Sequence, residues 1–240
     1  MCLSRSSLLL IVAVSVFLTP IVVNAQSTDR SRLFNQIEDL RGQIKQKETQ
    51  LLAVADQDKA NYSEFLGRRD AGICRLMPRE KYEPALLIRG GGAYYSFTQA
   101  SSELGSDSQI SLERGQFATG LIGANYGYIT DLGDVPISAL TAEYSAVRDL
   151  AVLVTPSAEP DVRIEQRKSG EGVKLGDHVY KGRTGASVDH TYVLRCVSYD
   201  RSDTLVAFRV VREDDDGSLT LTWKIVTRFP TPQLIRGDSR

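Results

Sequence analysis

Histidines limit the acid–base chemistry that this chain could perform. The sequence has two, His178 and His190. His190 follows Asp189 and lies close to Ser187, and a hydrolytic triad needs a histidine that takes the serine proton while a carboxylate orients the ring. Adjacent residues of a strand point to opposite faces, however, and the sequence contains no Gly-x-Ser-x-Gly motif. We therefore expect both histidines to be surface residues, and we assign no catalytic residue.

Carboxylates offer a second chemistry. Glycoside hydrolysis needs two acids that face each other across a groove. Four acids of the central region are candidates, namely Glu103, Glu113, Asp131 and Asp134. The sequence does not bring any two of them together, so a secreted carboxylate-dependent hydrolase is kept as the alternative to a non-enzymatic function.

Two further motifs resemble ligand sites only superficially. The acidic run 213–216 lacks the alternation and the distal glutamate of a calcium loop, so a solvated hairpin tip is expected there. The run 90–92 consists of glycines, but the Gly-Lys-Ser/Thr of a phosphate-binding loop does not follow it. We expect no metal and no cofactor.

The cysteines indicate a disulfide. Cys2 precedes the apolar N-terminal run and would be removed with it. Cys74 and Cys196 would then be the remaining pair in an exported chain, where disulfides persist. A bond between them would close a long loop and contribute about 4 to 5 kcal/mol. The alternative is two buried free thiols.

The N-terminus predicts export. Arg5 lies in a short polar start, an apolar run covers 8–23, and Val23-Asn24-Ala25 has the form of a signal-peptidase site. We expect a signal peptide at 1–25, a secreted or periplasmic protein, and no membrane span after cleavage. An uncleaved anchor is the alternative, although the run is short for a span of roughly 20 residues and contains Pro20.

Residues 26–66 predict an amphipathic helix. Apolar residues recur at spacings of three and four, with Lys47 where an apolar residue was due. They form a coiled-coil seam of Leu33, Ile37, Leu40, Ile44, Leu51 and Val54. Gly42 weakens the helix, which would be marginal in isolation. We expect it to join a homo-oligomer or to dock on a protein partner, or else to fold back on its own domain.

The rest of the chain predicts a connector and a β-rich domain. Charged residues and prolines fill the expected connector, 67–84. In 85–236, short strands separated by glycines are expected, with one helix in 136–154 and an extended piece at 162–166. The fold class is thus mainly β, an antiparallel sheet that resembles a sandwich or barrel; with the N-terminal helix it is α+β overall.

The clearest strands form a C-terminal meander over 191–229. Apolar residues alternate with polar ones in 219–225, and Asp214-Asp215-Asp216-Gly217 is typical of a hairpin turn. Placing Phe208 opposite Trp223 aligns the apolar pairs of the last two strands. In the first hairpin, we expect Cys196 rather than Arg195 on the core face.

Two surfaces could bind a ligand or partner. One is aromatic, in the glycine-rich region; the other is the outer face of the meander, where cations accompany apolar residues. Their residues are Tyr94, Tyr95, Tyr126, Tyr128, Arg195, Arg209 and Lys224. Ordinary core packing is the alternative for the tyrosines, and a covering helix of the same chain is the alternative for the outer face.

The sequence thus favours an exported binding or assembly module, and a structural subunit of the cell envelope is a further alternative. Its 29 basic and 30 acidic residues give no bulk attraction to nucleic acid, so no nucleic-acid partner is expected.

Overall fold

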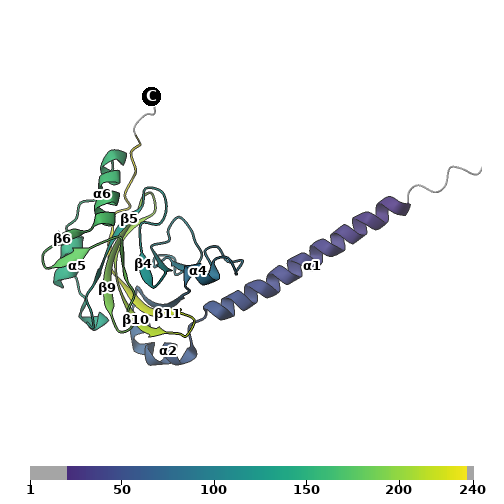
Figure 1. Ribbon diagram of the computed structural model, residues 1–240, viewed down its shortest axis with the longest axis horizontal. Coiled ribbons are helices and arrows are strands. Elements are labelled where there is room, and N and C mark those ends of the chain that lie inside the picture. Colours follow the sequence, from purple (N-terminus) through teal and green to yellow (C-terminus); the bar gives the residue numbers. More distant parts are fainter. Residues whose placement is uncertain (1–20, 237–240) are drawn as a thin grey trace, which may run out of the picture. The chain divides into compact units, whose positions relative to one another are not determined.

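The structure is a computed structural model that describes residues 21–236 (Figure 1). The chain divides into two compact units, one ending at Gln46 and the other beginning at Lys47. The signal peptide expected at 1–25 lies almost entirely outside the described residues. The helical elements are α1 (Ile21–Leu52), α2 (Asp56–Asn61), α3 (Ser63–Leu66), α4 (Arg79–Tyr82), η1 (Ile137–Ala139), α5 (Ser145–Ala151) and α6 (Glu159–Glu171).

The helix expected over 26–66 is interrupted. α1 ends at Leu52, and α2 and α3 follow as separate short helices. Val54, which lies in the interruption, is buried at 8% exposure. The prediction of one continuous helix was therefore wrong beyond Leu52, because this part of the chain packs into the second unit.

A five-stranded antiparallel sheet is the centre of the second unit. Its strand order is β1-β11-β10-β9-β5. Their bounds are β1 (Ala71–Leu76), β5 (Tyr126–Asp131), β9 (Thr191–Ser198), β10 (Ser202–Glu213) and β11 (Leu219–Phe229). β1 lies in the segment expected to be a connector, so 67–84 contains an integral strand and does not separate two domains.

The expected meander is present in β9, β10 and β11. Phe208 pairs with Trp223 as predicted, and Cys196 pairs with Thr204. A bulge between Val210 and Arg212 shifts the end of the hairpin by one residue. Gly217 takes φ +82° in the turn, a backbone conformation that L side chains rarely adopt.

Two smaller sheets complete the antiparallel architecture. One has the order β2-β3-β4-β8, and the other pairs β6 with β7. Their bounds are β2 (Tyr94–Tyr95), β3 (Ile110–Glu113), β4 (Gln116–Ala118), β6 (Val173–Leu175), β7 (His178–Tyr180) and β8 (Arg183–Gly185). The fold class was predicted correctly as mostly antiparallel β with an N-terminal helix, although the sheets do not close into a barrel.

Both faces of the five-stranded sheet are covered. β4 and α4 lie on one side of it, and α5 and α6 lie on the other (Figure 1). The first face carries an aromatic core in which the ring of Phe208 stacks on Tyr192 at 5.0 Å and meets Phe117 edge-on at 5.1 Å. The second face packs Val193, Leu205 and other apolar residues against α5 and α6.

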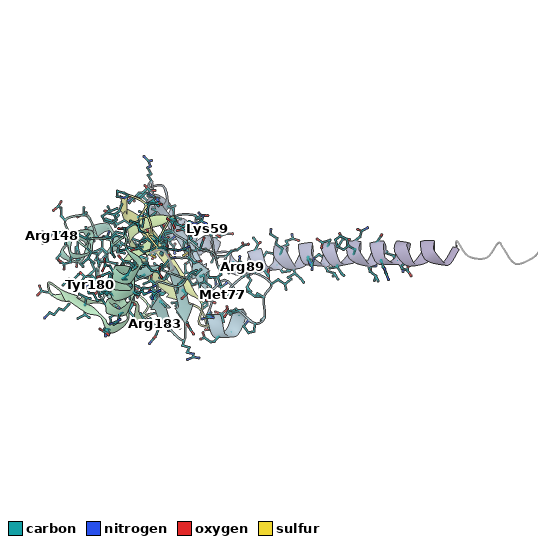
Figure 2. The ribbon with its side chains drawn as sticks, turned by 90° about the horizontal axis from the view of Figure 1, so that it is seen from above. Lys59, Met77, Arg89, Arg148, Tyr180 and Arg183 are labelled. Carbon is teal, nitrogen blue, oxygen red and sulfur yellow. The ribbon has the colours of Figure 1, made fainter. Side chains whose placement is uncertain are left out.

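Tyr180 belongs to this second core (Figure 2). Its ring is fully buried, and its hydroxyl donates to the carbonyl of Ala146 at 3.1 Å. Burial raises the pKa of Tyr180, as does the neighbouring Asp149 carboxylate. The hydroxyl therefore remains protonated and ties β7 to α5.

Candidate functional site

The exposed apolar residues of α1 form the most conspicuous candidate site. Leu33, Phe34, Ile37, Leu40 and Ile44 have exposed fractions of 54, 61, 47, 55 and 41%. They recur at helical spacing, so they form one stripe, called here the α1 stripe. Burial of such residues normally stabilises a protein by about 1.5 to 3 kcal/mol each. The α1 stripe is therefore a candidate interaction surface.

The α1 stripe ends where the second unit begins. Lys47 takes the next seam position, and the adjacent Glu48 is buried at 8% exposure. The Glu48 carboxylate accepts hydrogen bonds from the backbone N–H groups of Leu87 and Ile88. This carboxylate therefore fixes the last turns of α1 to the loop that precedes β2.

Two residues predicted for the seam belong to this anchored part. Leu51 is partly buried and Val54 is buried within the second unit. The carbonyl oxygen of Leu51 also accepts a hydrogen bond from Arg75 Nη1 at 2.9 Å. The predicted seam was thus too long by these two residues, and it did not include Phe34, which belongs to the α1 stripe.

The expected disulfide is not formed. Cys74 and Cys196 are both free and buried. Cys74 lies on β1 and Cys196 on β9, with β11 and β10 between them. Three strand spacings amount to about 14 Å, whereas the Cα atoms of a disulfide lie within about 7 Å. Burial raises the pKa of both thiols, that of Cys196 to about 11.

The expected aromatic surface is also absent. Tyr94, Tyr95 and Tyr126 are each 5% exposed, and Tyr128 is 3% exposed. The Tyr128 hydroxyl donates to Glu165 Oε2 on α6 at 2.7 Å. Core packing, the alternative reading of these tyrosines, is what the structure shows.

Two of the three cations predicted for the outer face of the meander have structural partners. Arg195 is 4% exposed and forms a two-pronged ion pair with Asp203, at 3.0 and 2.8 Å. Arg209 bridges Asp134 at 2.8 Å and Asp189 at 3.3 Å. Lys224 is partly buried, and both that burial and the charge of Arg68 lower its pKa. The second core and its helices cover this face, so it does not form the predicted binding surface.

The structure does not assemble the triad that was considered and set aside for Ser187, Asp189 and His190. The Asp189 carboxylate accepts from Arg209 rather than from His190. The Nδ1 atom of His190 instead lies 2.9 Å from Asp131 Oδ2, at a half-exposed site. The ring of His178 lies beside Tyr180 at 6.2 Å, and His178 is partly exposed.

Three of the four candidate acids lie against arginine or histidine side chains. Glu113 lies 3.5 Å from Arg79 and 3.7 Å from Arg183. Asp131 contacts His190 and Asp134 contacts Arg209, while Glu103 is exposed. Glycoside hydrolysis instead needs two acids that face each other across a groove.

The acidic hairpin tip is held by ion pairs. Arg75 Nη2 lies 2.7 Å from Asp214, and Arg212 contacts both Asp214 at 2.9 Å and Asp58 at 2.5 Å. Within residues 21–236, no three histidine, cysteine, aspartate or glutamate side chains are grouped to hold a metal ion. The acidic run therefore fastens the β10–β11 turn to β1 and α2.

The second unit also has a polar cleft of about 390 Å³. Its wall contains Lys181 and Arg183 beside Ser169 and Gly170, which lie near the C-terminal end of α6. Helix carbonyl groups carry partial negative charge at that end, so a nearby lysine complements the helix. The Ser169 hydroxyl is already committed to the Gly127 carbonyl, at 2.5 Å. Ser169 and Lys181 therefore have structural roles in the wall of this cleft.

No described helix combines the length and apolar character needed to span a membrane. No protein-family model, no curated protein and no solved structure matches this chain.

Proposed function

We propose that this chain is an exported assembly module that joins a protein partner through the α1 stripe. The observation that carries the proposal is the exposure of five large apolar side chains in one row of a long helix. Contiguous exposed apolar surface marks interaction sites, whereas single exposed residues need no explanation. The export step rests on the N-terminal sequence pattern at 1–25.

The charge and packing of the second unit support a non-enzymatic role. Its main sheet is covered on both faces, Glu113 and Asp134 lie against arginines, and Asp131 lies against His190. A carboxylate-dependent hydrolase needs two uncompensated acids across a groove. This alternative therefore has less support than assembly.

The test of assembly compares two charged variants in cells. Leu40→Asp places a carboxylate within the α1 stripe, whereas Asn35→Asp places one on the opposite side of the same helix. Chains that carry their own N-terminus are expressed, fractionated and separated on native gels. We expect wild type and Asn35→Asp to migrate as one exported assembly and Leu40→Asp to migrate as a smaller species.

Other results would contradict the proposal. If wild type and Leu40→Asp migrate identically as monomers, the α1 stripe has no assembly role. If the protein remains inside the cell with residues 1–25 attached, as mass spectrometry would show, the export step fails.

A further inference from the structure

We infer that the partner of the α1 stripe is a second copy of this chain, paired in parallel and in register as a two-stranded coiled coil. This inference rests on the proposed function and names its partner. In a heptad written abcdefg, Leu33 and Leu40 take position d, and Ile37 and Ile44 take position a. The same four side chains are among the exposed apolar residues of α1.

The identity of these residues favours two parallel strands. β-branched isoleucine at a with leucine at d packs best in a parallel dimer, because the two positions present their knobs at different angles. An antiparallel pair would instead place Leu33 opposite Ile44 and mix the two residue types in every layer. The α1 stripe is self-complementary, as a two-fold interface requires.

The flanking positions do not oppose this pairing. Gln36 and Gln43 take position g, and Arg41 takes position e, so a parallel pair places Gln36 of one copy near Arg41 of the other. Arg41 is already neutralised within its own helix by Glu38, at 2.7 Å. No like charges therefore meet along the seam between Leu33 and Ile44.

The ends of the seam are set by charge. Arg30 takes the a position before Leu33, and Lys47 takes the d position after Ile44. A parallel dimer would bring two arginines together at the first and two lysines together at the second, which opposes pairing there. The apolar seam is thus limited to four layers, and we expect a dimer that dissociates on dilution.

Light scattering tests self-association on residues 26–240, the form that signal-peptide cleavage would leave. We expect a dimer that gives way to monomer between about 100 and 1 μM. We expect Leu40→Asp to raise the concentration of half-dissociation at least about tenfold, and Asn35→Asp to leave it within about twofold. Circular dichroism of each variant checks that the fold is retained.

Cysteine cross-linking tests the orientation. In a parallel pair, Ile44→Cys meets its own counterpart; in an antiparallel pair it would meet position 33, and the two copies of position 44 would lie about 16 Å apart along the axis. We expect Ile44→Cys to form a disulfide dimer on mild oxidation, and a mixture of Ile44→Cys with Leu33→Cys to give only like-with-like dimers. Cys74 and Cys196 are buried, so the introduced thiol is the one that reacts.

The outcomes separate this inference from the proposed function. A mixed 33–44 disulfide, a trimer, or a monomer at every concentration would each overturn the parallel dimer. If the purified chain is a monomer while the cellular assembly still depends on Leu40, the partner is a different protein and the proposed function stands. If neither the purified nor the cellular protein assembles, both fail.

Discussion

Arg195 uses all five of its N–H donors inside the protein. Two go to the Asp203 carboxylate, two to the carbonyls of Leu150 and Leu153 at 2.8 and 2.6 Å, and one to the Thr155 hydroxyl at 3.0 Å. The guanidinium also lies 4.0 Å from the ring centre of Phe229. A buried cation is tolerated when its charge and donors are all matched, so this residue joins α5 to β9 and β10.

Removing the Asp203 carboxylate should therefore lower the stability of the fold. Asp203→Asn leaves the Arg195 charge buried without compensation, and we expect the free energy of unfolding to fall by about 3 to 5 kcal/mol. Glu159→Gln breaks the exposed pair with Arg163 and should cost no more than about 1 kcal/mol. Urea unfolding of residues 26–240 measures both. If the two variants lose the same free energy of unfolding, the buried pair stabilises the protein no more than the exposed one.

Asp216 at the hairpin tip should make the free energy of unfolding depend on pH. Partial burial would raise the pKa of Asp216, but hydrogen bonds from Tyr82 and Ser218 and the charge of Arg75 outweigh it and lower the pKa to about 2. The pKa of Asp216 is lower in the folded protein than in the unfolded chain. The stability that this carboxylate contributes is therefore complete above about pH 4 and is lost as the pH falls toward 2. With solvent screening it amounts to roughly 1 kcal/mol.

Asp216→Asn tests this dependence. We expect the variant to be less stable than wild type at pH 6 and the difference to shrink as the pH falls from about 4 to 2. Urea unfolding at each pH measures the difference. A stability difference that stays constant down to pH 2 would mean that the Asp216 carboxylate is not the titrating group.

Local patterns predicted some elements and not others. Strict alternation in Leu219, Leu221 and Trp223 was enough to predict β11 and its pairing, because one face is packed against an aromatic core. The extended piece expected at 162–166 is instead part of α6. Pro160, with acidic residues in the first turn, is a signal for the start of a helix.

The candidate site was predicted in part for a similar reason. Helical spacing identified Leu33 to Ile44, but spacing alone could not show that Leu51 and Val54 pack into the second unit. Nor could residue type show that Arg195 would be buried, because three of its partners lie at 150–155, far from Arg195 in the sequence. The disulfide prediction failed because strand order, which separates Cys74 from Cys196, is a property of the whole sheet.

The helix α1 contains an opportunity for stabilisation at Gly42. No heavy atom lies within 4 Å of the position that a Cβ would take. Gly42 takes heptad position f, away from the α1 stripe. Alanine favours the helix by about 1 kcal/mol over glycine. We expect Gly42→Ala to increase helicity by circular dichroism and to strengthen the dimer; a weaker dimer would show that position 42 faces the partner.

At the scale of the molecule, the covered sheet and the exposed helix have complementary roles. The second unit buries the two faces of its main sheet, and the described surface richest in contiguous apolar residues is the α1 stripe. Glu48 and Leu51 connect this helix to the loop before β2 and to β1. The last turns of α1 therefore belong to the folded second unit, whereas the proposed assembly surface lies on the earlier turns.

Truncation should separate these two roles. A version of the chain from Lys47 to Arg240 keeps the Glu48 hydrogen bonds, the burial of Val54 and the Asp58–Arg212 ion pair. We expect it to be a monomer that unfolds at nearly the urea concentration of monomeric 26–240. A version that begins at Gly67 loses all three contacts.

The shorter version should be clearly less stable. Val54 alone contributes about 1.5 to 2 kcal/mol by burial, and Arg212 would be left without Asp58 and Arg75 without the Leu51 carbonyl. We expect a total loss of at least about 3 kcal/mol, measured by urea unfolding and light scattering at one concentration. If the versions that begin at Lys47 and Gly67 are equally stable, residues 47–66 do not belong to the folded unit. If the version from Lys47 dimerises as strongly as 26–240, the pairing surface lies outside the α1 stripe.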